Sequence, residues 1–400
     1  MTFLDDARAA ARLLAGVATR TPVESSRALS QIAGVPVLLK CENLQRAGSF
    51  KIRGAYVRMA RLSPEEQARG VVAASAGNHA QGVALAAQLL GIDAVVYMPV
   101  DAALPKIAAT KEYGAEVRLH GRSVDEALVQ ARAEAERTGR VLIHPFDHED
   151  IVAGQGTLAL EILEQVPDVR TIVVPLGGGG LAAGIQAVVA EVAPHVRVIG
   201  VQAARAAAYP ASLAAGEPVA APELHTMADG IAVGTPGAVP FALLHQHGCE
   251  VRTVSEEDLS RALLLVAERA KLLVEPSGAA GVAAVMAAPG ELDGPVVVLL
   301  SGGNIDPLVL LRVVRHGLAV SGRYLQLRVR VHDTPGALAA LLRELATTGG
   351  NVMHVSHVRT GVDLEIDEVE IEVQVETKGP EHCARVLQHL RDAGFRLAEH

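Results

Sequence analysis

Lys51 lies at the predicted start of a helix, a position where a lysine can act as a nucleophile. It belongs to the segment ENLQRAGSFKIRGA (42–55), and the helical pattern FKIRGAYVRMARL begins at Phe50. The positive end of a helix dipole lowers the pKa of a nearby amine and favours its neutral form. A neutral amine is the form that Schiff-base chemistry requires. The alternative is a solvated lysine in the first turn of an ordinary helix.

Four consecutive glycines, Gly177, Gly178, Gly179 and Gly180, separate a predicted strand from a predicted helix that begins near Leu181. Glycines let the backbone approach an anion closely, and the amides at a helix start then bind a phosphate. The run lacks the lysine of a Walker loop and the spacing of a dinucleotide-binding fingerprint. A plain loop is the alternative, but the position between strand and helix favours a phosphate site.

The loop SAGNHAQG (75–82) also joins a predicted strand to a predicted helix. Amides at a helix start, together with a serine and an asparagine, form a cradle for a carboxylate. The candidate substrate-binding residues are Ser75, Ala76, Gly77, Asn78 and His79. An ordinary capped helix start is the alternative.

Ser301 directly follows a predicted strand over 296–300 and precedes the residues Gly302-Gly303-Asn304. A serine at the end of a strand often only caps a turn. The residues alone favour such a cap, and a chemical role for Ser301 depends on the family resemblance described below.

Short β-branched runs alternate with longer helical patterns up to about Gly317. The runs are nearly continuous and apolar, as in strands buried on both faces, and they predict an α/β fold with two helix-covered, mainly parallel sheets. Strands are predicted at 71–74, 94–98, 116–119, 141–144, 171–174, 196–199 and 296–300. One helix is predicted after the 75–82 loop and ends at 90, and another follows the strand 94–98 and ends at 113. A third covers about 123–138, and a long helix begins at Ser255, which is followed by an acidic first turn.

The pattern changes after Gly317 to a βαββαβ unit whose sheet faces are half exposed. Strands are predicted at 325–331, 352–358 and 367–377, helices at 337–347 and 381–393, and turns at 332–336 and 349–351. We therefore predict two domains. The first covers 1–318 and contains a smaller inserted subdomain at about 41–145, and the second, of the α+β class, covers 319–400.

The composition argues against several classes of protein. The 400 residues, of which 50% are hydrophobic, can form two to three domains. A net charge of −9, without a Lys/Arg stripe, argues against a nucleic-acid partner. The cysteines Cys41, Cys249 and Cys383 lie far apart and predict reduced thiols in a cytoplasmic protein. No secretory signal is visible, and proline and glycines interrupt the uncharged stretch 171–190, so we expect no membrane partner.

The four motifs together resemble those of the pyridoxal-phosphate-dependent serine/threonine dehydratases, which have a tryptophan-synthase-β-like fold. They occur in the order of that family, and the segments ADGIAVGTPG (228–237) and LLVEPSGAAG (272–281) extend the resemblance. The motifs DTPGAL (333–338) and GGN (349–351) of the C-terminal unit resemble the ACT amino-acid-sensing domain.

The resemblance implies a pyridoxal 5′-phosphate cofactor. It assigns Lys51, beside Phe50, to hold the cofactor and to remove the α-proton of the substrate. The loop Gly177–Leu181 would bind the phosphate, Asn78 the 3′ oxygen, and Ser301 the pyridine nitrogen. Because a hydroxyl cannot fully protonate that nitrogen, the ring is a weaker electron sink, which favours β-elimination over racemisation.

For the substrate, the resemblance assigns the loop Ser75–His79 to the carboxylate and Phe146 to an apolar wall beside the threonine methyl group. Two departures from related serine racemases matter. Ala76 replaces a serine that protonates the second face of Cα, which argues against racemisation. Gln202 and Ala208 replace an acidic pair that binds a divalent cation, so we predict no metal site.

The resemblance thus implies dehydration of L-threonine to 2-oxobutanoate and ammonia, and of L-serine to pyruvate, in isoleucine biosynthesis. Alternatives on the same fold are serine racemase, serine dehydratase and a β-replacement enzyme. A catalytically silent amino-acid sensor is an alternative of another class. The ACT-like unit predicts isoleucine as an effector opposed by valine, or else a dimerisation module without a ligand. The family predicts a homodimer or homotetramer.

Overall fold

The computed structural model describes residues 2–359 and 364–398. The chain divides into two compact units, 1–309 and 310–400. The predicted domain ranges, 1–318 and 319–400, stay predictions. Residues 1, 360–363 and 399–400 of those ranges lie outside the described residues.

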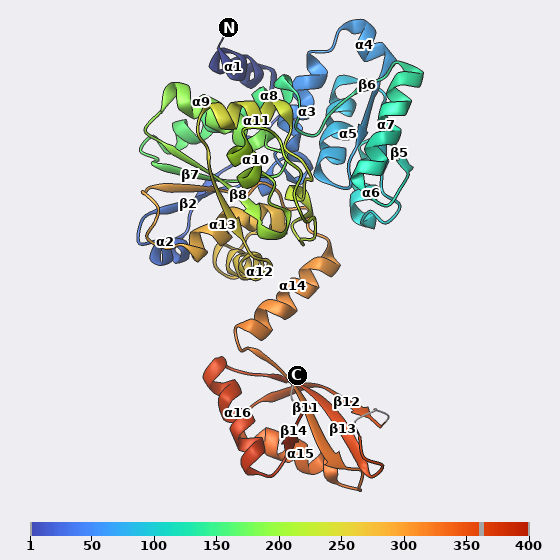
Figure 1. Ribbon diagram of the computed structural model, residues 1–400, viewed down its shortest axis with the longest axis vertical. Coiled ribbons are helices and arrows are strands. Elements are labelled where there is room, and N and C mark those ends of the chain that lie inside the picture. Colours follow the sequence, from blue (N-terminus) through green and yellow to red (C-terminus); the bar gives the residue numbers. More distant parts are fainter. Residues whose placement is uncertain (1, 360–363, 399–400) are drawn as a thin grey trace. The chain divides into compact units, whose positions relative to one another are not determined.

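The first unit contains a six-stranded sheet with the order β1–β2–β10–β7–β8–β9 (Figure 1). Its strands are β1 (Val23–Ser25), β2 (Val37–Lys40), β7 (Thr171–Pro175), β8 (Arg197–Ala203), β9 (Glu250–Val254) and β10 (Val296–Leu299). All neighbours pair in parallel except β1, which runs antiparallel to β2. The predicted parallel sheet is confirmed, and β1, β2 and β9 are strands that the sequence pattern did not predict.

Helices cover both faces of this larger sheet. Ile172 and Val297 belong to the core that α9 (Gly180–Val192) helps to form, whereas Val173 and Val298 lie against Gly281 on α13 (Pro276–Ala287). Successive strand residues therefore contact opposite helix layers, which explains why these strands are apolar throughout. Helix α8 (Glu149–Gln165) packs against α9.

A second, smaller sheet has the order β5–β4–β3–β6, and all its strands are parallel (Figure 1). Its strands are β3 (Val71–Ala74), β4 (Ala94–Met98), β5 (Glu116–Leu119) and β6 (Val141–Leu142). Helix α5 (Asn78–Leu90) contributes to the core on one face and α7 (Val124–Thr138) to the core on the other. The predicted burial on both faces is confirmed for β3 and β4 and wrong for β5, which is exposed or half-exposed because it is an edge strand.

The remaining helices of the first unit connect and cover these sheets. The α-helices are α1 (Phe3–Leu13), α2 (Arg27–Ala33), α3 (Lys51–Ala60), α4 (Pro64–Arg69), α6 (Leu104–Glu112), α10 (Tyr209–Ala215), α11 (Ala238–Gln246) and α12 (Glu256–Leu265). Short helical turns are η1 (Glu42–Leu44), η2 (Arg46–Gly48), η3 (Ala204–Ala206), η4 (Asp229–Ile231) and η5 (Val266–Ala270). The predicted cap of α12 is confirmed, because the Ser255 side chain accepts a hydrogen bond from the Asp258 amide.

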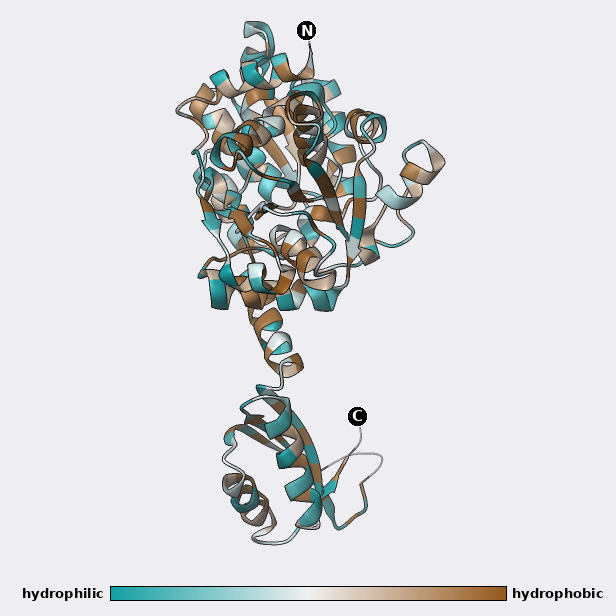
Figure 2. Ribbon diagram, turned by 90° about the vertical axis from the view of Figure 1, so that its left-hand side faces the viewer, coloured by the Kyte–Doolittle hydropathy of each residue, from teal (hydrophilic) through white to brown (hydrophobic). Residues whose placement is uncertain are grey.

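The second unit contains an antiparallel sheet with the order β12–β13–β11–β14 and confirms the predicted βαββαβ order. After α14 (Pro307–Val320) come β11 (Tyr324–His332), α15 (Ala337–Thr347), β12 (Asn351–Val358), β13 (Glu368–Glu376), α16 (Pro380–Asp392) and β14 (Arg396–Leu397). Burial alternates along β13, and Figure 2 shows both hydrophilic and hydrophobic residues on this sheet. Among the described residues, no helix is both long and apolar enough to span a membrane.

Candidate active site

One cavity of about 700 Å³ in the first unit brings every predicted site residue together. Its lining includes Phe50, Lys51, Ser75, Ala76, Gly77, Asn78, His79, Phe146, Gly177, Gly178, Gly179, Gly180, Leu181 and Ser301. These residues follow the carboxyl ends of strands in both sheets, where the ends of parallel strands meet. The arrangement agrees with a common site, whereas the role of each residue stays a prediction.

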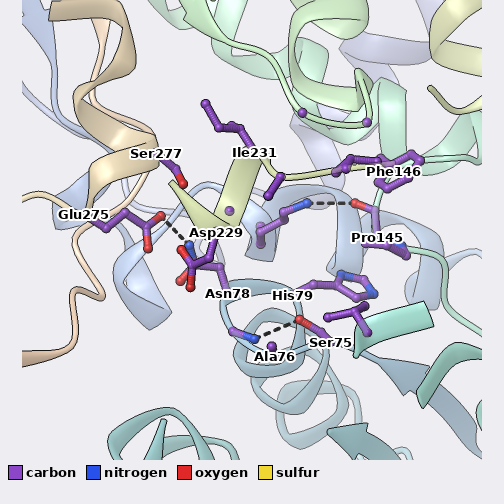
Figure 3. A pocket seen from close by; sticks show the side chains of 18 of the residues that line it. Ser75, Ala76, Asn78, His79, Pro145, Phe146, Asp229, Ile231, Glu275 and Ser277 are labelled. Atoms are coloured by element: carbon purple, nitrogen blue, oxygen red, sulfur yellow. Dashed lines mark hydrogen bonds between the residues drawn. The ribbon is translucent and has the colours of Figure 1, made fainter. Parts of the chain in front are cut away.

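Lys51 is the first residue of α3, at the predicted helix start, and its partly buried side chain lines the cavity. Lys51 Nζ donates a hydrogen bond of 2.9 Å to the carbonyl oxygen of Pro145 (Figure 3). Burial lowers the pKa of this amine to about 8, and the nearby charge of Glu275 partly opposes that shift. The lowered pKa agrees with the sequence argument, but its main cause is desolvation and not the helix dipole.

A buried network of charges holds the first turn of α3 in place. The guanidinium of Arg53 donates to both carboxylate oxygens of Glu42, at 2.8 and 2.9 Å, and to Glu161 at 2.7 Å. Lys40, at the end of β2, donates to the other oxygen of Glu161 at 2.7 Å. Such a network constrains geometry, because removal of one partner leaves an unpaired buried charge. It therefore fixes the position of Lys51 relative to β2 and α8.

The tetraglycine loop is a turn in which two positions, Gly178 and Gly179, have no room for a Cβ. Gly179 has φ +103°, in the left-handed region, and a Cβ there would collide with the hydroxyl of Tyr209 and approach Pro240 to 2.7 Å. A Cβ at Gly178 would collide with the ring of Phe146. The loop leads into α9, whose first amides have no partners within the helix. This geometry suits a bound phosphate.

The loop after β3 is held by hydrogen bonds from both subdomains (Figure 3). The Gly77 amide donates to Ser75 Oγ at 3.1 Å, and Asn78 Nδ2 donates to Glu275 Oε1 at 2.6 Å. The ring of His79 is buried and bonds the Ile143 carbonyl at 2.8 Å. Burial lowers the pKa of His79 to about 3, so the ring is neutral and acts as an internal support.

Further polar groups line the cavity near the end of β10. Ser301 is buried, and its carbonyl accepts a hydrogen bond from the Phe50 amide at 3.2 Å, which places the two motifs side by side. Among the described residues, Glu275 Oε2 and Ser277 Oγ are buried without a hydrogen-bond partner. Burial raises the pKa of Glu275 to about 7, and the charge of Asp229 adds to this effect.

Sequence reasoning missed Lys106, which also lines the cavity. Its Nζ donates a hydrogen bond of 2.7 Å to Asp229 Oδ2. Lys106 and Thr110 are the buried residues of α6, and this i, i+4 spacing is the only signal in the local sequence. Lys111, on the same helix, is exposed. The sequence around the two lysines does not indicate which of them is buried.

Gln202 and Ala208 occupy the positions where related serine racemases have the acidic pair that binds a divalent cation. Gln202 Oε1 accepts a hydrogen bond from the Tyr209 amide at 2.9 Å, and Ala208 is buried. Within the described parts of the chain, no group of three or more His, Cys, Asp or Glu residues could hold a metal ion. The absence of a metal site stays a prediction.

Comparisons with known proteins agree with this geometry. Residues 14–302 match the family described as pyridoxal-phosphate dependent enzyme, and residues 325–393 match the ACT domain. An L-threonine ammonia-lyase of Geobacter sulfurreducens is 46% identical over 377 residues, 94% of each chain. Another, from Thermotoga maritima, is 44% identical over 397 residues, 99% of each chain. The processed form of threonine deaminase isoform 2 from Solanum lycopersicum has a TM-score of 0.74 and 37% identity, over 78% of this chain and 91% of that one.

Proposed function

The chain belongs to the family of pyridoxal-phosphate-dependent enzymes, and on this premise we propose that it is a threonine ammonia-lyase, which converts L-threonine to 2-oxobutanoate and ammonia. One observation supports this activity most. A single cavity joins a partly buried lysine of lowered pKa to a turn in which a Cβ would collide with neighbouring side chains at Gly178 and Gly179. L-Serine, converted to pyruvate, is a second proposed substrate.

The residues of the cavity fit pyridoxal 5′-phosphate. The turn at Gly177–Gly180 presents backbone and helix-start amides, which can bind a phosphate group. At Gly178 and Gly179 a Cβ would collide with Phe146 and Tyr209, so the turn depends on glycine. We assign the phosphate to Gly177–Leu181, the 3′ oxygen to Asn78, the pyridine nitrogen to Ser301, and the covalent attachment to Lys51 beside Phe50. Bound pyridoxal phosphate supplies an electron sink, which makes the α-proton of an amino acid acidic.

Lys51 is the base in this proposal. An amine with a pKa of about 8 is partly neutral near neutral pH, and Nζ then accepts the α-proton of the substrate. Its hydrogen bond to the Pro145 carbonyl restrains the position of the amine. The ring of Phe50 lies 5.2 Å from Nζ and helps to exclude water from it.

The substrate is oriented by groups at two sides of the cavity. We assign its carboxylate to the loop Ser75–His79, where the α5 helix begins, and its β-methyl group to the wall that Phe146 forms. The cavity wall at Ala76 has no side-chain donor that could return a proton to Cα. This supports elimination over racemisation as the main reaction.

The C-terminal ACT domain supports a proposal about how the activity is regulated. We propose that isoleucine binds this domain and lowers activity, that valine opposes it, and that the enzyme serves isoleucine biosynthesis. We also propose a cytoplasmic homodimer or homotetramer, in analogy with the family. The predictions of no nucleic-acid partner and no membrane partner are retained.

The proposed function is tested with the cofactor-loaded full chain. We expect 2-oxobutanoate and ammonia from L-threonine in equal amounts, and little or no D-serine from L-serine. Lys51→Ala should lower turnover by about 10²- to 10⁴-fold or more, because both the attachment point and the base are lost. Lys111→Ala, which removes an exposed lysine, is the matched control.

Each rival makes a different prediction in the same assay. A racemase would interconvert L- and D-serine faster than it forms ketoacid. A silent sensor would bind an amino acid without any turnover. Ketoacid formation by Lys51→Ala at the wild-type rate would refute the assignment of Lys51.

A further inference from the structure

Lys106 is a buried cation in the cavity wall that the proposed function does not use. It lies in the first turn of α6, with 8% of its surface exposed. Burial alone would lower the pKa of Lys106, but the charges of Asp229, Glu275 and Asp306 outweigh burial and raise it above 10.5. Lys106 is therefore a permanent positive charge at neutral pH.

The amine of Lys106 lies against the loop that we assign to the substrate carboxylate. A Cβ on Gly77 would be 3.2 Å from Lys106 Nζ, so the amine and the Gly77 backbone are neighbours. Gly77 immediately precedes α5, and Gly77 and Asn78 line the same cavity as Lys106. The first amides of a helix have no partners within the helix. A carboxylate bound by those amides would lie within reach of the ammonium group.

Asp229 holds the ammonium group in this position. The aspartate is on η4, which packs against α13 of the larger subdomain, whereas α6 belongs to the smaller one. The 2.7 Å bond between Lys106 and Asp229 uses one of the three N–H donors of the lysine. Two donors remain for other acceptors.

The cavity is lined by more acidic than basic side chains. Five acidic residues line it: Asp101, Asp125, Asp229, Glu275 and Asp306. The other lining lysine, Lys51, is assigned to the cofactor, and Arg122 is the remaining lining arginine. Because like charges repel in a partly desolvated site, a substrate carboxylate would enter unfavourably without a nearby positive charge.

We propose that Lys106 is a substrate-binding residue whose ammonium group receives the α-carboxylate of the amino acid at the Ser75–Asn78 loop, while Asp229 positions that group. The proposal rests on the proposed function, since it assumes an α-amino acid bound by this loop. It adds to the loop a charged recognition element that selects for substrates with a free carboxylate.

The test compares Lys106→Gln, Lys106→Arg and the exposed control Lys111→Gln in the cofactor-loaded full chain. The measurements are KM and kcat for L-threonine, and the inhibition constant of butanoate, a carboxylate without an amino group. A charge-assisted hydrogen bond predicts that Lys106→Gln raises both KM and the butanoate constant by about 10- to 100-fold, with a smaller change in kcat. Lys106→Arg should restore most of the affinity, and Lys111→Gln should match the wild type.

Asp229→Asn separates carboxylate binding from a merely structural bridge. It keeps the ammonium group, so KM should rise less than in Lys106→Gln. Equal effects of the two variants, with no further effect in the double variant, would mean that the pair only joins the subdomains, and would overturn the proposal. Unchanged KM and butanoate inhibition in Lys106→Gln would overturn it as well.

Failure of this proposal is distinguishable from failure of the proposed function. Absence of ketoacid formation by the wild type would refute the function, whereas normal wild-type turnover with an indifferent Lys106 would refute only the inference. Cofactor absorbance and the thermal midpoint report whether each variant is folded. If Lys106→Gln does not fold, Lys106→Met, which keeps an unbranched stem, is judged by the same criteria.

Discussion

The side-chain amide of Asn78 donates a 2.6 Å hydrogen bond to Glu275 Oε1, a residue 197 positions later in the chain (Figure 3). Asn304 Nδ2 donates to the other end of the same amide, Asn78 Oδ1, at 2.9 Å. These bonds fix the orientation of the Asn78 side chain, which connects the start of α5 to the start of α13. Because burial raises the pKa of Glu275 to about 7, the charge of its carboxylate changes near neutral pH.

Glu275→Gln should change how stability depends on pH. The pKa of Glu275 is about 7 in the folded chain and near 4.5 as a free group. The folded chain therefore binds more protons between about pH 4.5 and 7, and the free energy of unfolding loses this contribution as the pH rises through that window. Glutamine keeps a hydrogen-bond acceptor but does not titrate, so a pH-dependent loss of about 3 kcal/mol should disappear.

Urea unfolding of the cofactor-free chain at pH 5 and pH 8 measures this effect. The wild type should lose more stability than Glu275→Gln between these two values. Glu112→Gln, an exposed substitution on α6, should behave like the wild type. The same pH dependence in Glu275→Gln and the wild type would show that Glu275 does not titrate in this window.

Gly179→Ala should impair cofactor binding. The left-handed φ of +103° and the collision with Tyr209 mean that the turn must rearrange to accept a methyl group. We expect cofactor affinity to fall by at least about tenfold, with a loss of stability of about 2–4 kcal/mol. Equilibrium titration of the apoenzyme with pyridoxal phosphate measures the affinity.

Gly16→Ala is the control for backbone strain alone. Gly16 has φ +77°, and a Cβ at this position would meet no other atom within 4 Å. Alanine there should therefore cost about 1 kcal/mol without changing cofactor affinity. Equal cofactor affinities of Gly179→Ala and Gly16→Ala would refute the assignment of the glycine turn to the phosphate.

The sequence predicts which loops come together in the cavity, whereas the role of each residue stays a prediction. Lys51 near a helix start and the loop 75–82 between a strand and a helix follow from local patterns of strand, glycine and helix. Parallel strands then bring their carboxyl ends to common edges, so motifs that are distant in the chain meet in one cavity. To predict this meeting it is enough to know that the strands are parallel, and the exact order of the strands in each sheet is not needed.

Long-range pairs of side chains are not encoded in such patterns. Lys106 meets Asp229 across 123 positions, and nothing local to either residue indicates the other. The cause of the lowered pKa of Lys51 is likewise not predictable from the sequence, because its burial depends on residues from several elements. We predict burial of β5 on both faces, but two of its four residues, Glu116 and Arg118, are charged. Its edge position, set by tertiary pairing, also leaves it partly exposed.

Ala76→Ser should add racemisation to elimination. The substitution places a hydroxyl on the cavity wall in the loop next to Gly77, where a proton can be returned to Cα from a second direction. We expect D-serine from L-serine at a measurable rate, together with incorporation of solvent deuterium at Cα. Ketoacid formation should continue, because Lys51 is unchanged.

Ala102→Ser adds a hydroxyl elsewhere on the cavity wall and serves as the control. It should form no more D-serine than the wild type. If Ala76→Ser also forms no more D-serine than the wild type, proton delivery to the second face does not depend on position 76.

Isoleucine should lower the activity of the full chain through the C-terminal ACT domain. The turn at 332–336 leads into α15, whose first amides can receive an amino-acid carboxylate, and Gly349 and Gly350 follow the end of that helix. Coupling between an effector and a substrate is typically about 5- to 150-fold in affinity. We therefore expect isoleucine to raise the apparent KM for L-threonine within that range, and valine to reverse this increase.

A chain that ends at Gly317 should keep ketoacid formation and lose the response to isoleucine. The cofactor content and thermal midpoint of this shortened chain report whether it is folded. Equal inhibition of the shortened and full chains by isoleucine would place the effector site in the first unit.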